Sequence, residues 1–226
     1  MFVKMSYPLY EGAPIGYFTT VQTKITPTLR IANGDASNNE EVHLFTHNGT
    51  HMDAPWHFNL EGKQIDELDV EDWVFNNPKT IDVSSRPNRD VDRSDIEPFF
   101  SENDDSDLLL IFSGLSRIRE SNTKEYTDNF PGLTTSAAKF IIEETKLRGI
   151  ALDFMSVESA ESMRANIWSV HRTLLGRRDV SQRSIVIIED VNLAPILGKK
   201  IKRVFAAPLL IKGIGGSPVN MFAEID

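Results

Sequence analysis

The sequence of 226 residues contains no cysteine, which excludes disulfide bonds, thiolate metal sites and a cysteine nucleophile. It also lacks long apolar runs, and the opening residues MFVKMSYPLYEG match neither a signal peptide nor a membrane span. Basic residues are in the minority, 24 against 33 acidic ones, and the net charge of −9 argues against a nucleic-acid-binding surface. We therefore expect a soluble cytoplasmic protein without a nucleic-acid or membrane partner.

What the sequence does have is the composition of a globular domain. Hydrophobic residues make up 40% and charged residues 25%, and no repeat, low-complexity tract or linker divides the chain. We therefore expect residues 1–226 to form a single domain, with a core large enough to fold without a metal ion.

Strand-like runs outnumber helix-like segments. The runs DLLLIF and SIVIIE are apolar throughout, as in strands that are covered on both faces. Helices are predicted at 134–149, with Thr134 or Thr135 as the N-cap, and at 159–176. Strands are predicted at 23–31, 41–47, 79–83, 107–112, 149–154, 184–189 and 203–211. The expected class is α/β, or α+β, with a mixed sheet.

Three of the five histidines lie in the stretch HNGTHMDAPWH, residues 47–57. Gly49 weakens a helix and Pro55 breaks one, so an uninterrupted helix is not expected here. We expect the strand at 41–47 to enter a tight turn that is followed by a short irregular segment. Such a turn can bring several polar side chains to one point.

The side chains that this turn would gather form a metal-ligand set. His47, His51 and Asp53 supply two imidazoles and one carboxylate, and open coordination positions would make a catalytic site for Zn²⁺ or another divalent ion. We expect His57 to lie near the ion without binding it, as a proton carrier near neutral pH. Trp56 either lines an apolar pocket for a flat or aromatic substrate or is a plain core residue.

Further ligands should come from distant parts of the chain. His171 is one candidate, with a position at the edge of the core as its alternative. Glu189 ends a buried strand, where a carboxylate needs a partner or a metal ion, and Asp190 fits equally well on spacing alone. His43 shares a strand face with His47, and we expect it in solvent or at the edge of the site.

Residues 47–57 resemble the His-x-Gly-Thr-His-x-Asp-x-Pro-x-His signature of the metal-dependent cyclase family, which includes bacterial kynurenine formamidase and isatin hydrolase. All seven fixed positions of the signature agree in order. Other segments are similar to the family in the same order: 7–15, 107–114, 130–141, 149–159, 170–176, 185–193 and 207–219. The resemblance therefore covers most of the chain.

This resemblance implies roles that spacing alone leaves open. One metal ion would be held by His47, His51 and Asp53. A second ion, where the site is binuclear, would be held by Asp53, His171 and Glu189. The resemblance favours Glu189 over Asp190 and makes His57 the catalytic histidine. It also implies a swivelling β/β/α fold, Zn²⁺ or Mn²⁺ as the ions, and a homodimer or homotetramer.

Departures from the family fall where a substrate pocket is expected. Asn220 stands where relatives commonly carry an arginine, and the segment 158–169 differs from the shorter link of the formamidases. The link between His171 and Glu189 is also longer and contains the basic stretch 176–183. The resemblance therefore does not assign kynurenine chemistry to this chain.

The predicted function is a metal-dependent hydrolase that cleaves a C–N or C–O bond next to a carbonyl, in an aryl formamide, cyclic amide or lactone. A divalent ion lowers the pKa of bound water to about 7, and His57 would move the proton. A cyclase or lyase that closes a ring is the enzymatic alternative, and a non-catalytic metal-binding protein is the other. A substrate-sized pocket beside His57 would distinguish an enzyme from a storage protein.

Overall fold

The computed structural model describes residues 1–16, 21–86, 89–176 and 183–226. Its strands form a mixed sheet of nine strands and a separate two-stranded ribbon. The strands of the large sheet are β1 (Phe2–Lys4), β4 (His51–Asp53), β5 (Val74–Phe75), β6 (Pro78–Asp82), β7 (Leu108–Phe112), β8 (Gly149–Leu152), β9 (Val186–Glu189), β10 (Ile201–Pro208) and β11 (Gly216–Ile225).

The strand order places β4 and β9 side by side in the middle of the sheet. The order is β5-β10-β11-β4-β9-β8-β7-β6, and β1 pairs with β11. Strands β6 to β9 run parallel, whereas β4 is antiparallel to both β9 and β11. This arrangement confirms the predicted α/β class with a mixed sheet.

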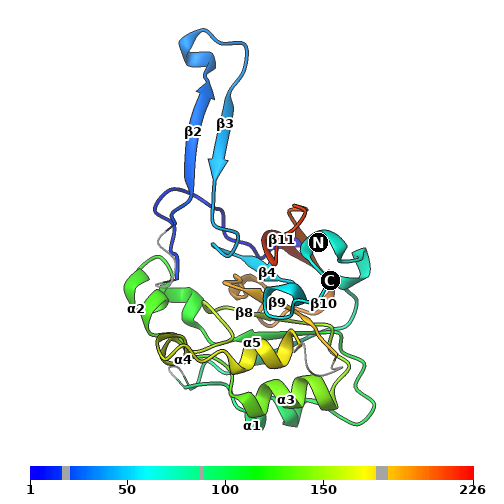
Figure 1. Ribbon diagram of the computed structural model, residues 1–226. Helices are drawn as coiled ribbons and strands as arrows, with labels where there is room; N and C mark the ends of the chain where they lie inside the picture. Colours follow the sequence, from blue (N-terminus) through cyan, green and yellow to red (C-terminus); the bar gives the residue numbers. More distant parts are fainter. Residues whose placement is uncertain (17–20, 87–88, 177–182) are drawn as a thin grey trace.

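The helices lie together on one side of the sheet (Figure 1). They are α1 (Arg93–Ile96), α2 (Thr123–Asp128), α3 (Thr135–Glu144), α4 (Ala160–Arg164) and α5 (Ser169–Leu174). Thr134 is the N-cap of α3, because its hydroxyl accepts the backbone N–H of Ala137 at 3.1 Å. Within the described residues, no helix has the length and hydropathy that a bilayer-spanning segment requires.

The prediction of one continuous helix at 159–176 is wrong. Ser159 caps α4, since its hydroxyl accepts the N–H of Ser162 at 3.2 Å. The helix then stops, and Asn166 takes the left-handed conformation with φ 55°, which an α-helix cannot contain without strain. The chain starts again as α5, so His171 lies on a short helix of its own.

The strand predictions also need correction. The segment after the turn at Gly49, which was expected to be irregular, begins with β4 inside the large sheet. β3 (Asn39–His43) ends before Phe45, so the predicted strand at 41–47 is wrong in its second half. β11 was not predicted, because Gly216 and Pro218 at its start resemble a turn. Its residues alternate between buried and less buried positions, which is the pattern of a strand with one face in the core.

Two apolar cores occupy the two faces of the sheet. The first, which includes Leu109 and Ile141, packs the helices against the sheet. The second, which includes Met52, Ile188 and Met221, lies on the other face. β7, β8 and β9 are buried along their whole length, as their apolar sequences predict.

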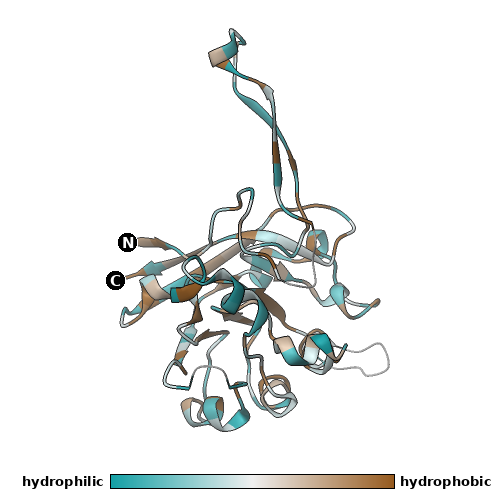
Figure 2. Ribbon diagram, turned by 90° about the vertical axis from the view of Figure 1, so that its left-hand side faces the viewer, coloured by the Kyte–Doolittle hydropathy of each residue, from teal (hydrophilic) through white to brown (hydrophobic). Residues whose placement is uncertain are grey.

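A slender ribbon leaves this body. β2 (Lys24–Leu29) pairs with β3 in an antiparallel hairpin, and we call residues 24–43 the arm. Every residue of both strands is exposed. Figures 1 and 2 show the arm projecting far from the body, on the side away from the helices.

Candidate metal centre

The register between β4 and β9 builds the centre of the site. His51 and Asp53 are two residues apart on β4, so their side chains lie on the same face of the sheet. His51 pairs with Glu189 across the two strands. The carboxylate of Glu189 at the end of β9 therefore lies beside the imidazole of His51 at the start of β4. The distance from His51 Nε2 to Glu189 Oε2 is 3.4 Å.

The turn before β4 adds His47. Gly49 takes the left-handed conformation with φ 64°, which lets the chain reverse sharply between the two histidines. His47 Nδ1 lies 2.8 Å from Asp53 Oδ1, and His51 Nε2 lies 3.6 Å from the same oxygen. The structure thus brings together the three residues predicted as the first ligand set, each offering one atom within 4.8 Å of the others.

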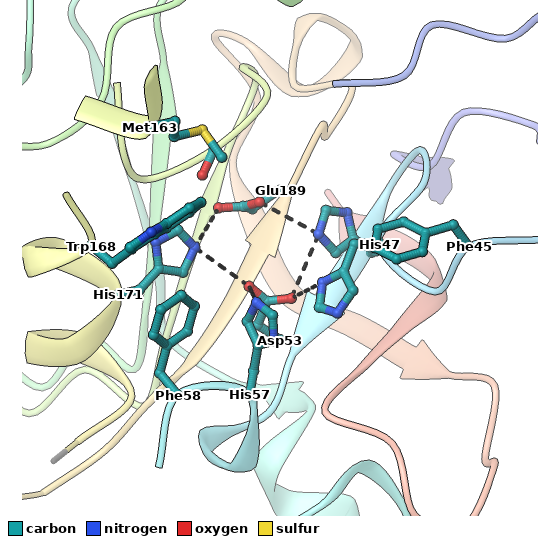
Figure 3. Close-up of a pocket in the computed structure, with 11 residues that line it drawn as sticks. Phe45, His47, Asp53, His57, Phe58, Met163, Trp168, His171 and Glu189 are labelled. Carbon is teal, nitrogen blue, oxygen red and sulfur yellow. Dashed lines mark ion pairs between the residues drawn. The ribbon is translucent and has the colours of Figure 1, made fainter. Parts of the chain in front are cut away.

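The second predicted set also comes together. His171, on α5, approaches from the helical side, and its Nε2 lies 3.7 Å from Asp53 Oδ2 and 3.6 Å from Glu189 Oε1. Asp53, His171 and Glu189 again offer atoms within 4.8 Å of one another. Asp53 lies between the two sets and presents one oxygen to each (Figure 3).

Asp53 is the clearest sign that these residues fit a divalent ion. Its carboxylate is 1% exposed, yet neither of its oxygens accepts a hydrogen bond, although His47 lies close to one of them. A buried carboxylate that accepts no hydrogen bond needs positively charged neighbours, which can be protonated imidazoles or a metal ion. Burial alone would raise the pKa of Asp53, but the imidazoles of His57, His47 and His51 hold it well below its usual range. Imidazole nitrogens and carboxylate oxygens are the donors that Zn²⁺ and Mn²⁺ accept.

The candidate ligands are held by the chain around them. His51 Nδ1 lies 2.8 Å from the carbonyl oxygen of Gly49, and a proton on Nδ1 leaves Nε2 free toward the carboxylates. Glu189 Oε1 accepts the backbone N–H of Val157 at 2.8 Å. Gly216 lies against the ring of His47, and a Cβ atom there would come within 2.2 Å of it. Gly216, the first residue of β11, therefore leaves room for this candidate ligand.

His57 differs from the other histidines of the cluster. Its side chain is 31% exposed, against 13% for His47 and 3% for His171, and its Nε2 lies 4.0 Å from Asp53 Oδ2. It does not belong to either three-residue set. Desolvation lowers the pKa of His57 to about 4, with the positive charges of His47 and His171 acting in the same direction and Asp53 opposing them. His57 is therefore neutral near pH 7.

A cavity of about 230 Å³ opens beside this cluster. Its apolar walls are formed by Phe45, Phe58, Met163 and Trp168 (Figure 3). Trp56 is not among the described residues that line the cavity, so the structure does not bring the predicted pocket tryptophan to this site. Trp168 and Met163 come from the segment 158–169, where a departure from the family was noted.

Several predicted residues lie elsewhere. His43 is exposed on the arm, as expected. Asn220 is exposed on β11 and does not line this cavity. The basic stretch 176–183 lies mostly outside the described residues.

Asp190, the rival of Glu189, points to a different partner. Arg119 holds its carboxylate through two hydrogen bonds, Nε to Oδ1 at 2.8 Å and Nη2 to Oδ2 at 2.6 Å. The hydroxyl of Tyr126 donates a third at 2.5 Å. Asp190 has a left-handed φ of 53°, which turns the chain immediately after Glu189. The two adjacent acids therefore face different surroundings.

Two residues near His171 were missed from the sequence. The ring of Phe58 stacks on His171 with centroids 4.8 Å apart. Glu158 is buried, accepts the backbone N–H of Val170 at 2.6 Å, and has Oε1 3.7 Å from His171 Nδ1. A single phenylalanine in the sequence does not indicate that it stacks on a histidine. Glu158 could have been noticed, because it is an acid that comes shortly before the segment of His171.

The comparison with known protein families matches the part of the chain that carries the 47–57 motif. A family model described as "Putative cyclase" matches residues 3–159, which is more than half of the chain. The chain belongs to the cyclase family. The match contains the 47–57 motif, and the predicted family is confirmed.

Relatives of this cyclase-family chain include enzymes. A kynurenine formamidase of Bacillus thuringiensis (strain Al Hakam) is 30% identical over 175 residues, which are 77% of this chain and 74% of the relative. Cyclase-like protein 3 of Oryza sativa subsp. japonica is 29% identical over 202 residues, 83% of this chain and 66% of the plant protein. The chain thus spans about two thirds of the length of that plant relative.

Solved structures share the fold of this cyclase-family chain. Isatin hydrolase A from Labrenzia aggregata, bound to benzyl benzoate, has a TM-score of 0.83 and 21% identity, and the likeness covers 99% of this chain and 93% of that one. Isatin hydrolase A from Ralstonia solanacearum also has a TM-score of 0.83, with 19% identity over 99% and 91% of the two chains. These likenesses confirm the predicted fold.

Proposed function

We propose that this protein is a metal-dependent hydrolase that cleaves a C–N or C–O bond next to a carbonyl. The observation that carries the proposal is Asp53, a buried carboxylate without a hydrogen-bond donor, set between two groups of candidate ligands beside a cavity. The chain's membership of the cyclase family and its similarity to a kynurenine formamidase support the same chemistry.

The ligands we propose are five side chains with two overlapping roles. His47, His51 and Asp53 would hold one divalent ion, and Asp53, His171 and Glu189 would hold a second. We propose Zn²⁺ or Mn²⁺, one or two ions per chain, because the donors are imidazole nitrogens and carboxylate oxygens. A divalent ion at this place would make water a stronger nucleophile and would polarise the carbonyl of the substrate.

The proton would be carried by His57, the proposed catalytic residue. Its Nε2 faces Asp53, and its ring is the most exposed of the cluster, so it can meet both a water molecule and a substrate. Neutral His57 accepts the proton that the attacking water releases as the C–O bond forms. It then donates this proton to the leaving nitrogen or oxygen as the C–N or C–O bond breaks.

The substrate would be small, flat and largely apolar. The cavity of about 230 Å³ is lined by the rings of Phe45, Phe58 and Trp168 and by the side chain of Met163. Such walls accept an aromatic ring by stacking and edge contacts. We therefore propose an aryl formamide, with a cyclic amide or a lactone as the next classes to test.

The cavity also argues against a storage or structural role. A site that only holds metal needs closed coordination and no space for a substrate, whereas here the cavity reaches both the candidate ligands and His57. Ring closure at the same site stays the enzymatic alternative. A relative with 30% identity is a kynurenine formamidase, which favours hydrolysis.

Assembly and location are further proposals. We propose a homodimer or homotetramer, on the family resemblance, and one functional domain over residues 1–226, because both cores share one sheet. A cytoplasmic location stays a prediction from the sequence.

The decisive experiment combines metal analysis with a panel of substrates. Protein freed of metal and then loaded with Zn²⁺ or Mn²⁺ is incubated with N-formylkynurenine, aryl formamides, isatin and small lactones. We expect hydrolysis of at least one aryl amide, together with one or two ions per chain, and loss of both in His51→Ala. His43→Ala is the matched control, since this histidine lies outside the cluster and should change neither. Metal content below about a tenth of an ion per chain after loading would contradict the proposal.

A further inference from the structure

Glu158 is a buried acid beside the candidate metal centre. It lies between β8 and α4, and it is 1% exposed. Among the residues that the structure describes, His171 is the one side chain with which it forms an ion pair, from Oε1 to Nδ1 at 3.7 Å. A buried carboxylate is costly unless donors or a positive charge lie close to it. The reason for this acid is therefore to be found at His171.

The backbone at the start of α5 holds the carboxylate in place. Glu158 Oε1 accepts the N–H of Val170 at 2.6 Å and the N–H of His171 at 3.2 Å. The N–H of Glu158 itself donates to the hydroxyl of Ser156 at 3.3 Å. The acid is thus tied to the same helix that carries the imidazole, so the two groups keep a fixed relative position.

The two nitrogens of the His171 ring have different surroundings. Nε2 lies 3.7 Å from Asp53 Oδ2 and 3.6 Å from Glu189 Oε1 (Figure 3). Nδ1, on the other side of the ring, is buried and has no hydrogen-bond partner. Glu158 Oε1 lies just beyond hydrogen-bond distance from it, so a small movement of the ring makes this contact a hydrogen bond.

Aromatic neighbours restrict the plane of this ring but not which atoms it presents. Phe58 stacks on His171 at an interplanar angle of 29°, and Trp168 meets it at 67° with the centroids 5.7 Å apart. A half-turn of the imidazole within this frame would exchange each nitrogen for a carbon. Only one of the two orientations offers an N–H to Glu158, and the same orientation points Nε2 toward Asp53.

The first ligand set has a different outer partner. His51 Nδ1 lies 2.8 Å from the carbonyl oxygen of Gly49, which carries no net charge. A carboxylate forms a stronger hydrogen bond than a carbonyl does, and it makes the imidazole that donates to it a better metal ligand. The charge of Glu158 therefore acts on the set that contains His171.

We propose that Glu158 is a positioning residue for the second ion, the one assigned to Asp53, His171 and Glu189. Its carboxylate accepts a hydrogen bond from Nδ1–H of His171 and thereby keeps the lone pair of Nε2 directed at the ion. Glu158 does not line the cavity beside the cluster, so it acts through His171. This role rests on the proposed function, because it requires a metal ion at the second set.

The test compares Glu158→Gln with the control Glu161→Gln. The glutamine keeps an oxygen that accepts the N–H of Val170, so α5 keeps its first turn, but the negative charge is lost. Glu161 lies on α4, is exposed and belongs to neither ligand set. Metal-free protein is titrated with Zn²⁺ by calorimetry, and urea unfolding checks the fold of each variant.

We expect wild type and Glu161→Gln to bind two ions per chain. In Glu158→Gln one ion should bind as in wild type, and the other about 10–100-fold more weakly, the usual effect of losing the outer partner of a ligand. Such a difference between the two ions does not follow from a role in helix capping, because the glutamine retains the cap.

NMR of protein labelled with ¹⁵N at histidine supplies the second readout. In Zn²⁺-loaded wild type we expect His171 to carry its proton on Nδ1 and the ion on Nε2. The resonance of the Nδ1 proton should move upfield in Glu158→Gln, because a neutral acceptor forms a weaker hydrogen bond, and it should stay in place in Glu161→Gln.

Three results would overturn the role of Glu158. The variant could bind both ions with wild-type affinity, it could lose affinity for both ions equally, or wild type could bind one ion without any change in the His171 signals. In each case the protein still binds metal, so the proposed function would stand. A wild type that binds no metal at all would overturn both.

Discussion

Asp53 and Asp190 are both buried carboxylates, and the chain treats them in opposite ways. Asp190 is held by two hydrogen bonds from Arg119 and one from Tyr126. Asp53 has imidazoles around it but accepts no hydrogen bond at either oxygen. The charge of Asp190 is therefore balanced by fixed hydrogen bonds, whereas the charge of Asp53 is balanced only by imidazoles, which can give up their protons to make way for a metal ion.

The backbone at Asp190 also holds the strand that carries Asp53. The hydroxyl of Thr50 donates a hydrogen bond to the backbone oxygen of Asp190 at 2.6 Å. Thr50 precedes His51 and Asp190 follows Glu189, so this bond joins the two strands that carry the ligands. The ion pair of Asp190 with Arg119 thus stabilises the backbone, whereas the carboxylate of Asp53 is left available for chemistry.

Removing the charge of Asp53 should have the largest effect. In Asp53→Asn both ligand sets lose their shared carboxylate, so we expect loss of bound metal and a fall in hydrolysis of about 10⁴-fold or more. The metal-free variant should also be less stable than metal-free wild type at pH 7, because it loses the attraction between the Asp53 carboxylate and the imidazoles that lowers the pKa of this carboxylate. Metal analysis and urea unfolding check the two parts, and full metal content in the variant would break the comparison.

Removing the charge of Asp190 should do the reverse. Asp190→Asn leaves the buried guanidinium of Arg119 with only the exposed carboxylate of Glu120 as a counter-charge. We expect the free energy of unfolding of the metal-free protein to fall by about 3 kcal/mol. Asparagine tolerates the left-handed conformation of this position, so backbone strain does not obscure the result. Metal content per folded chain should stay as in wild type. An unfolding free energy unchanged within about 0.5 kcal/mol would show that the ion pair is not structural.

His57→Ala sharpens the distinction between ligands and proton carrier. We expect the variant to keep its metal and its fold, while turnover falls by about 10²–10⁴-fold, the usual contribution of a positioned acid or base. His51→Ala should instead lose metal and activity together. If His57→Ala loses its metal as completely as His51→Ala does, the residue is a ligand and the division of roles is wrong.

Metal affinity should depend on pH above neutrality. In the metal-free protein, burial alone would lower the pKa of His51, but its hydrogen bond to Glu189 and the charge of Asp53 raise it to about 9. The carboxylates of Glu158 and Glu189 likewise raise the pKa of His171 to about 9, against burial. Below that pH these imidazoles hold protons that a metal ion must displace.

Protons and metal ions compete for the same imidazole nitrogens. Affinity should rise as pH rises, by about tenfold per pH unit for each displaced proton, and level off only near pH 9. With ordinary histidine pKa values near 6.5, the affinity would level off about two and a half pH units lower. Calorimetric titration with Mn²⁺ from pH 6 to 9 measures the difference, and a flat affinity above pH 7 would contradict the raised values.

The sequence alone was sufficient to propose His47, His51 and Asp53 as candidate ligands, because these three have short-range signals. Gly49 and Pro55 mark a turn, and the spacing of His47, His51 and Asp53 around it indicates one site. Glu189 was harder, since Asp190 has the same spacing. The cross-strand register of β4 and β9 places Glu189 opposite His51, and no local pattern contains that register.

The features that were missed depend on contacts between distant residues. Arg119 lies 71 residues before Asp190 and carries no motif of its own. Gly216 faces His47 only because β11 pairs with β4. The arm was predicted as strands, but a strand pattern does not show whether the body supplies a layer to cover it.

The most direct test is a crystal structure of the protein loaded with Zn²⁺ or Mn²⁺, with anomalous scattering recorded at the absorption edge of the metal. We expect one or two anomalous peaks in contact with Asp53, at ligand distances of about 2.0–2.2 Å for Zn²⁺, and none at Asp190. With two ions, each oxygen of Asp53 should contact one of them. A loaded, active protein whose metal lies away from Asp53 would contradict the claim that this unpaired carboxylate is the centre of the active site.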